Sequence, residues 1–153
     1  MNPILAVGNS IGTAREALFP FDAPVCGISR MVGVLLGVNV NSATTDYPVT
    51  LILLPGCNFV VNKIMLNNAS TSLTTATAGV FTATAGGGIA LAADQVLSGL
   101  TSATKNLSLT LAAGATTNVL NQTTQANVLY FRCGTAQGAA ATVDVYVFAD
   151  VLP

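Results

Sequence analysis

The sequence predicts an all-β, mostly antiparallel chain that folds as a single β-sandwich of the jelly-roll or another Greek-key type. Three observations predict it: about eight short segments alternate in polarity or are continuously apolar, polar or Gly-rich turns separate them, and only one convincing helix is indicated. A length of 153 residues suits one domain with its own core. We expect an extended N-terminal arm over residues 1–24 and one sandwich domain over residues 25–153.

The first half of the domain carries three predicted strands. Residues 32–40 alternate, with a branched side chain at every second position, which is typical of a strand with one buried face. Residues 49–54 are continuously apolar, as expected for a strand buried on both faces. Residues 59–66 again read as a strand, and polar or turn-forming segments separate the three at 41–46, 55–56 and 67–75.

The second half carries five further predicted strands and a helix. The helix is expected over residues 92–100, where Val96, Leu97 and Leu100 form an apolar stripe and Asp94 lies near the start. Gly86 to Gly88 are predicted to form a turn. The strands are expected at residues 80–84, 89–91, 106–111, 128–133 and 142–148.

Alternation does not fix the topology, and an immunoglobulin-like sandwich is the alternative, although the chain has no Trp to support it. The arm contains Phe19 and Phe21 between turn-forming residues, and Thr13 and Glu16 have the spacing of a capping box for a short helix over 13–18. An arm of this kind lies either on a neighbouring subunit or across its own sheet.

Charged residues make up only 7% of the chain, against about 25% in ordinary soluble domains. With five basic and six acidic residues, most of the surface must be small and uncharged, which favours assembly into a homo-oligomer. A monomer with a Thr- and Asn-rich coat is the alternative. Five scattered cations form no track for nucleic acid. The longest apolar runs, 31–38 and 49–55, are far shorter than the roughly 20 residues of a membrane span, and we expect no signal peptide.

Catalytic and metal-binding chemistry is poorly represented. The chain has no His, so neither a Ser-His-Asp nor a Cys-His arrangement can form, and the sequence predicts no enzyme, cofactor or metal site. Asp144 is expected to face solvent or to pair with Arg132. Cys26, Cys57 and Cys133 are interpreted as small buried side chains, with disulfides as the alternative.

A short internal echo marks a candidate interface. Thr75-Ala-Thr-Ala-Gly79 is followed by Thr82-Ala-Thr-Ala-Gly86, which is too little for a solenoid repeat. Together with the arm's aromatic pair, its Thr residues form the candidate interface set: Phe19, Phe21, Thr75, Thr77, Thr82 and Thr84.

Two stretches of the C-terminal half carry a resemblance to a known family. The stretches that carry it are Leu97-Ser-Gly-Leu-Thr-Ser-Ala-Thr-Lys-Asn-Leu-Ser-Leu-Thr-Leu and Leu129-Tyr-Phe-Arg-Cys-Gly-Thr-Ala-Gln-Gly-Ala-Ala-Ala-Thr-Val-Asp-Val-Tyr-Val-Phe. They resemble small virion proteins of tailed bacteriophages, particularly head decoration or cement subunits. The resemblance covers roughly residues 50–153 and implies a β-rich trimer, made in the host cytoplasm, that contacts the major capsid protein or other virion proteins. A fibre-tip or carbohydrate-binding sandwich is the alternative, and it would need exposed aromatic side chains grouped in a groove.

Overall fold

The computed structural model describes residues 29–124 and 126–152. The predicted arm, with its short helix over 13–18, lies outside these residues, as do Phe19, Phe21 and Cys26. The described elements are β1 (Ser29–Asn39), β2 (Thr45–Thr50), β3 (Asn58–Asn67), β4 (Thr77–Phe81), the 3-10 turn η1 (Thr84–Gly86), β5 (Ala90–Val96), β6 (Asn106–Ser108), β7 (Leu120–Asn121), β8 (Val128–Thr135) and β9 (Thr142–Leu152).

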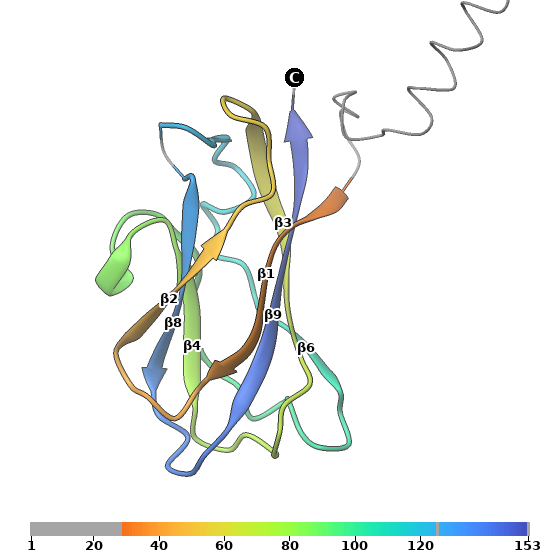
Figure 1. Cartoon of the computed structure of the whole chain (residues 1–153), viewed down its shortest axis with the longest axis vertical. Coiled ribbons are helices and arrows are strands. Elements are labelled where there is room, and N and C mark those ends of the chain that lie inside the picture. Colours follow the sequence, from red (N-terminus) through yellow and green to blue (C-terminus); the bar gives the residue numbers. More distant parts are fainter. Residues whose placement is uncertain (1–28, 125, 153) are drawn as a thin grey trace, which may run out of the picture.

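The strands form two antiparallel sheets that pack against each other (Figure 1). The first sheet has the order β1-β9-β3-β6, with β7 also paired to β3, and the second has the order β2-β8-β4-β5. The predicted all-β sandwich is therefore confirmed. Without the two-residue β7, eight strands divide into two sheets of four, an arrangement that agrees with a jelly roll. It differs from the immunoglobulin order, in which the first strand pairs with the second.

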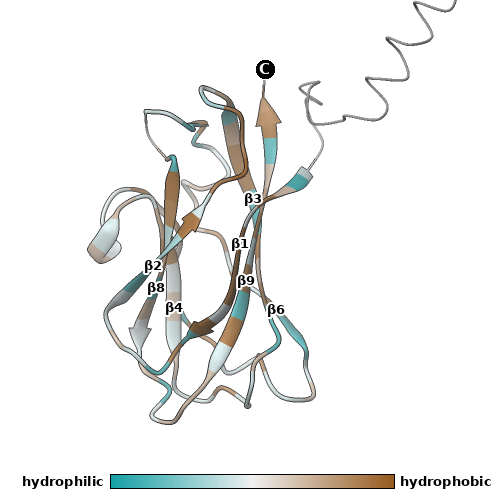
Figure 2. Cartoon of the chain, viewed as in Figure 1, coloured by the Kyte–Doolittle hydropathy of each residue, from teal (hydrophilic) through white to brown (hydrophobic). Residues whose placement is uncertain are grey.

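A single hydrophobic core fills the space between the sheets. Strand β9 alternates strictly, so that Val143, Val145 and Val147 are fully buried while the residues between them are only partly covered. Phe59 and Phe131 are the largest fully buried side chains and come from opposite sheets. Burial of each such side chain stabilises the fold by about 1.5–3 kcal/mol relative to exposure. Apolar residues colour most of β1 brown in Figure 2, beyond its first two residues.

One side of the sandwich is closed by a contact between β1 and the residues that follow β2. Gly33 and Leu51 form an isolated antiparallel bridge, and the backbone N–H of Ile52 donates to the carbonyl oxygen of Val32 at 2.7 Å. The free edge of β1 is thus partly occupied by the chain itself.

The opposite side is closed by residues 109–112, which cross from the first sheet to the second. Backbone N–H groups of this segment donate to the carbonyl oxygens of Ile64 in β3 and Leu91 in β5, both at 2.9 Å. The side-chain amide of Gln95 adds two hydrogen bonds with the backbone of Thr110, at 2.9 and 3.0 Å. Edges covered in this way give a partner little opportunity to add a strand.

Two sequence predictions are wrong. Residues 92–100 do not form a helix: Ala90–Val96 is strand β5, paired with β4, and the described residues contain only the 3-10 turn. Residues 49–54 are not a strand buried on both faces, because β2 ends at Thr50 and the side chains of Ile52 and Leu54 are 63% and 57% exposed. The other predicted strands are present with shifted ends, and β7 was not predicted.

Candidate interaction surfaces

The candidate interface residues Thr75 and Thr77 lie at the start of β4. The Thr75 hydroxyl donates to the backbone oxygen of Gln137 at 2.7 Å, and the Thr77 hydroxyl oxygen accepts a hydrogen bond from the backbone N–H of Thr135 at 2.9 Å. Both hydroxyl groups therefore tie β4 to the residues around the end of β8, although Thr75 itself is exposed.

The other two candidate threonines follow the opposite end of β4, so the echo does not form one continuous surface. The Thr82 hydroxyl oxygen accepts a hydrogen bond from the backbone N–H of Ile89 at 2.8 Å, which closes the loop between β4 and β5. Thr84 is exposed on η1, at the projecting end of this loop (Figure 1).

An ion pair lies beside that loop on the second sheet. Nη1 of Arg132 is 3.1 Å from Oδ1 of Asp46, and both side chains are 17% exposed. The other carboxylate oxygen of Asp46 accepts a hydrogen bond from the backbone N–H of Ala85 at 2.8 Å, which anchors η1 to β2. Arg132 thus pairs with Asp46 and not with Asp144.

The described cysteines are both free. Cys133 is fully buried in β8, and its thiol donates to the backbone oxygen of Val40 at 3.4 Å. Burial raises the pKa of the Cys133 thiol, and the negative charge of Asp94 raises it further. Cys57 is half-buried immediately before β3. Neither thiol is paired within the described chain.

Several large apolar side chains are exposed at one end of the sandwich. Ile52, Leu54 and Val119 belong to segments that flank the start of β3 and β7, and β9 ends beside the start of β3. We call this end of the sandwich, which carries Ile52, Leu54 and Val119, the terminal end. The first residue of β1 and the C-terminal residues of β9 lie there too (Figure 1). Among the described residues, the exposed large apolar side chains are Met31, Leu36, Ile52, Leu54, Val96 and Val119.

A second apolar surface covers the outside of the first sheet. The strand registers form two rows across β1, β9 and β3. In one row Met31 lies beside Phe148, and in the other Tyr146 lies between Val34 and Met65. We call these five residues the outer face. Met31 is 44% exposed, whereas the other four are partly covered. The sequence had placed Tyr146 and Phe148 opposite the buried valines of β9, but not beside Met31.

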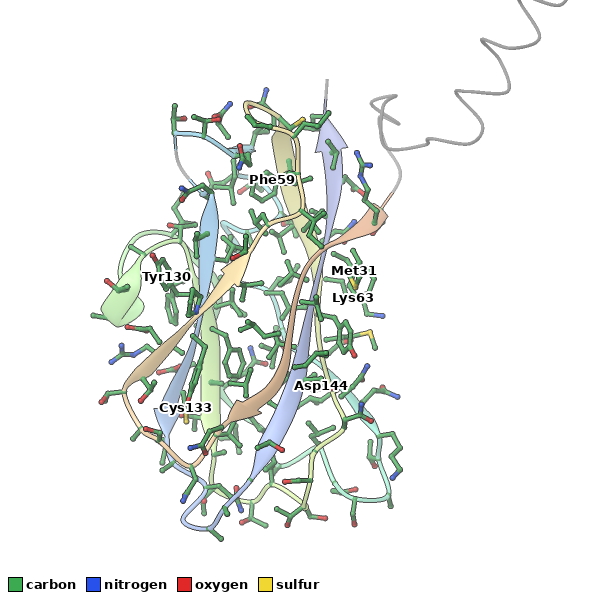
Figure 3. All side chains as sticks on the ribbon, in the orientation of Figure 1. Met31, Phe59, Lys63, Tyr130, Cys133 and Asp144 are labelled. Atoms are coloured by element: carbon green, nitrogen blue, oxygen red, sulfur yellow. The ribbon has the colours of Figure 1, made fainter. Side chains whose placement is uncertain are left out.

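Charged groups border the outer face. Lys63 extends the row of Phe148, and Figure 3 shows it on the same side of the sheet as Met31. Lys63 is exposed and has no ion pair within the described residues. Asp150 accepts a hydrogen bond from the Asn62 side chain at 2.8 Å, and Asp144 accepts hydrogen bonds from the backbone N–H of Gly37 and the Asn68 side chain at 2.8 and 2.7 Å.

The tyrosines lie on separate surfaces. Tyr47 packs against the core, and its hydroxyl donates to the backbone oxygen of Asn39. Tyr130 lies on the second sheet and Tyr146 on the first. The described residues therefore do not gather their tyrosines into the grouped surface that a carbohydrate-binding sandwich would need.

No family model, curated protein or solved structure matches the chain. Within residues 29–124 and 126–152, no group of three or more His, Cys, Asp or Glu side chains could hold a metal ion. The described part of the chain also has no helix of the length and apolarity needed to cross a membrane.

Proposed function

We propose that the chain is a structural subunit of a bacteriophage virion that acts through protein–protein packing and catalyses no reaction. A capsid decoration or cement protein, or another head- or neck-associated part, is the role that fits best. The observation that carries the proposal is a sandwich surface that exposes apolar side chains and has few charges. Eight charged residues belong to the described chain, and Arg132 and Asp46 neutralise each other.

Such a surface is suited to protein–protein packing and not to catalysis. Burial of apolar groups is favourable, and small polar groups can be buried where they form hydrogen bonds, whereas charges are costly to bury without a partner. An obligate interface of roughly 2,000 Å² or more would bury the exposed apolar residues, with Thr and Asn side chains at its rim. We expect the partners to be further copies of the chain, as a trimer, and the major capsid protein or other virion proteins.

The fold and the resemblance add weaker support. Jelly-roll sandwiches occur in viral capsid proteins, but they also occur in lectins, so the fold alone does not choose a function. The resemblance of residues 97–111 and 129–148 to phage decoration proteins favours the virion among these roles.

The test is the composition of purified phage particles. After density-gradient purification, tryptic peptides of this chain should be found at a fixed molar ratio to the major capsid protein. Abundant host cytosolic proteins, quantified in the same gradient fractions, measure carry-over. A chain that stays in the soluble lysate, or follows the cytosolic proteins and not the capsid, would contradict the proposal.

A further inference from the structure

The outer face is too small to hold two subunits together by itself. Strands in a sheet are about 4.8 Å apart and side chains on one face repeat about every 7 Å, so the two rows and their borders cover on the order of 300 Å². A stable interface buries about 800 Å² on each partner. If the outer face takes part in assembly, another segment must contribute further contacts.

Two of the sheet edges are partly occupied by the chain itself and leave little room for those contacts. The edge of β1 is partly occupied by Leu51 and Ile52, and residues 109–112 occupy the opposite side of the sandwich. An occupant of the outer face is therefore expected to lie across it and to be held by side chains, not by a backbone ladder.

Residues 1–28 have the length and composition for this role. Fully extended, 28 residues span up to about 90 Å, whereas an 11-residue strand such as β1 spans about 35 Å. The segment includes Phe19 and Phe21, whose aromatic rings match the aromatic and methionine side chains of the outer face. Pro20 and Pro24 accompany them, and proline cannot donate to a strand ladder, which fits a segment held by side-chain contacts.

Charge offers one local contact between the two parts: the border of the outer face, with Lys63, Asp144 and Asp150, sums to −1, and Lys63 is its one cation. Residues 1–28 contain Arg15, Glu16 and Asp22, a sum of −1. On the outer face Lys63 is exposed without an ion pair within the described residues, while Asp144 and Asp150 already accept hydrogen bonds from their own chain. Lys63 is thus available to a carboxylate of residues 1–28, either Glu16 or Asp22.

The direction of β1 indicates whether residues 1–28 bind the outer face of their own copy or that of a second copy. Ser29 lies beside Asp150, near the end of β9, and β1 runs from there into the sandwich. Residues 1–28 would have to reverse direction at Ser29 to cover their own sheet, whereas a second copy can be reached without a reversal. We propose that residues 1–28 of one copy bind the outer face of a second copy, with Phe19 and Phe21 against its apolar rows.

This inference rests on the proposed assembly of the chain and is tested in the full-length protein by cross-linking. One version carries the photo-cross-linker p-benzoylphenylalanine in place of Tyr146. A co-expressed second version keeps Tyr146 and carries Ile11→Val, which marks its N-terminal segment by mass. Irradiation should join position 146 of the first version to the marked segment of the second. The matched control replaces Tyr130, on the outside of the other sheet, and should give less than a tenth of that product (Figure 3).

Each other outcome overturns the inference. Cross-links from position 146 to the unmarked segment alone would mean that residues 1–28 cover their own sheet. Cross-links to residues 29–152 of a second copy would mean that two sandwiches pack directly. Equal yields from positions 146 and 130, or an oligomer without the product, would also overturn it. The proposed function would survive these results if the chain is present in particles.

A charge reversal gives a second readout. Lys63→Glu should raise the dissociation constant of the oligomer about five- to tenfold, because the attraction between Lys63 and a carboxylate of residues 1–28 becomes a repulsion. Lys105→Glu, before β6, changes the net charge equally and should alter the constant less than twofold. Equal effects of the two variants would assign the change to net charge and contradict the inference.

Discussion

At the scale of single residues, Gln137 joins the loop before β4 to the loop between β8 and β9. Its side-chain oxygen accepts hydrogen bonds from the backbone N–H groups of Thr74, Thr75 and Ala76 at 3.0, 3.3 and 3.2 Å. We expect Gln137→Ala to lower the free energy of unfolding by about 1–3 kcal/mol, because these donors lose their acceptor. Gln137→Glu keeps the acceptor and should cost less. Urea unfolding of both variants measures the difference, and equal losses would contradict the assigned role.

We expect Cys133 to make the stability of the fold decrease at alkaline pH. Burial raises the pKa of its thiol, and it also raises the pKa of the neighbouring Tyr47 hydroxyl, which the charge of Cys133 raises further. Their neutral forms are therefore favoured in the folded state, and the resulting stabilisation is complete below the unfolded-state pKa of Cys, about 8.5. It is lost as the pH rises through the raised values.

We therefore expect the urea midpoint to fall between pH 8 and pH 10.5. Cys133→Ala should unfold at lower urea throughout, because it leaves a small cavity, but its midpoint should fall less steeply with pH. Cys57→Ala, at a half-buried position, is the matched control. Parallel pH profiles for the wild type and Cys133→Ala would show that Cys133 does not set the alkaline dependence.

At the scale of elements, the loop between β4 and β5 depends on Gly88. Its φ is +69°, and a Cβ added there would collide with the Thr82 hydroxyl oxygen that accepts the Ile89 hydrogen bond. We expect Gly88→Ala to cost about 2–3 kcal/mol, because backbone strain and a steric collision act together. Gly138→Ala has a similar φ of +85° but open space, so it should cost about 1–2 kcal/mol. Thermal unfolding compares them, and equal costs would exclude the collision.

The elements that alternation predicted correctly are those with one face in the core. Strands β1, β3, β8 and β9 have an interior face and an outer face, so their sequences repeat every two residues. The helix predicted over residues 92–100 was wrong because an apolar spacing compatible with a helix turn also suits a short strand. Pairing with β4 favours the strand. The prediction of a strand buried on both faces at residues 49–54 was wrong because two of these side chains are exposed at the terminal end.

The candidate surfaces were only partly predictable for a similar reason. Alternation in β9 was enough to place Tyr146 and Phe148 on one face, opposite the buried valines. It could not place Met31 beside Phe148, because the pairing of β1 with β9 joins residues more than a hundred positions apart and includes two register shifts. For the threonines of the internal echo, the repeat suggested a single surface. The structure instead places them at opposite ends of β4.

At the scale of the whole molecule, the oligomeric state follows from the surface. The chain has a mass of 15.4 kDa, only 7% charged residues, and six exposed large apolar side chains in its described part. Charge repulsion between copies is therefore weak, and the exposed apolar side chains favour association. Size-exclusion chromatography with light scattering at micromolar concentration should therefore give a homo-oligomer, and a trimer is expected, near three times the chain mass. The apolar interface should survive 0.5 M salt, which weakens only its charged contacts. A monodisperse monomer would contradict the assembly on which both proposals depend, because the exposed apolar residues would then lack an occupant in the isolated protein.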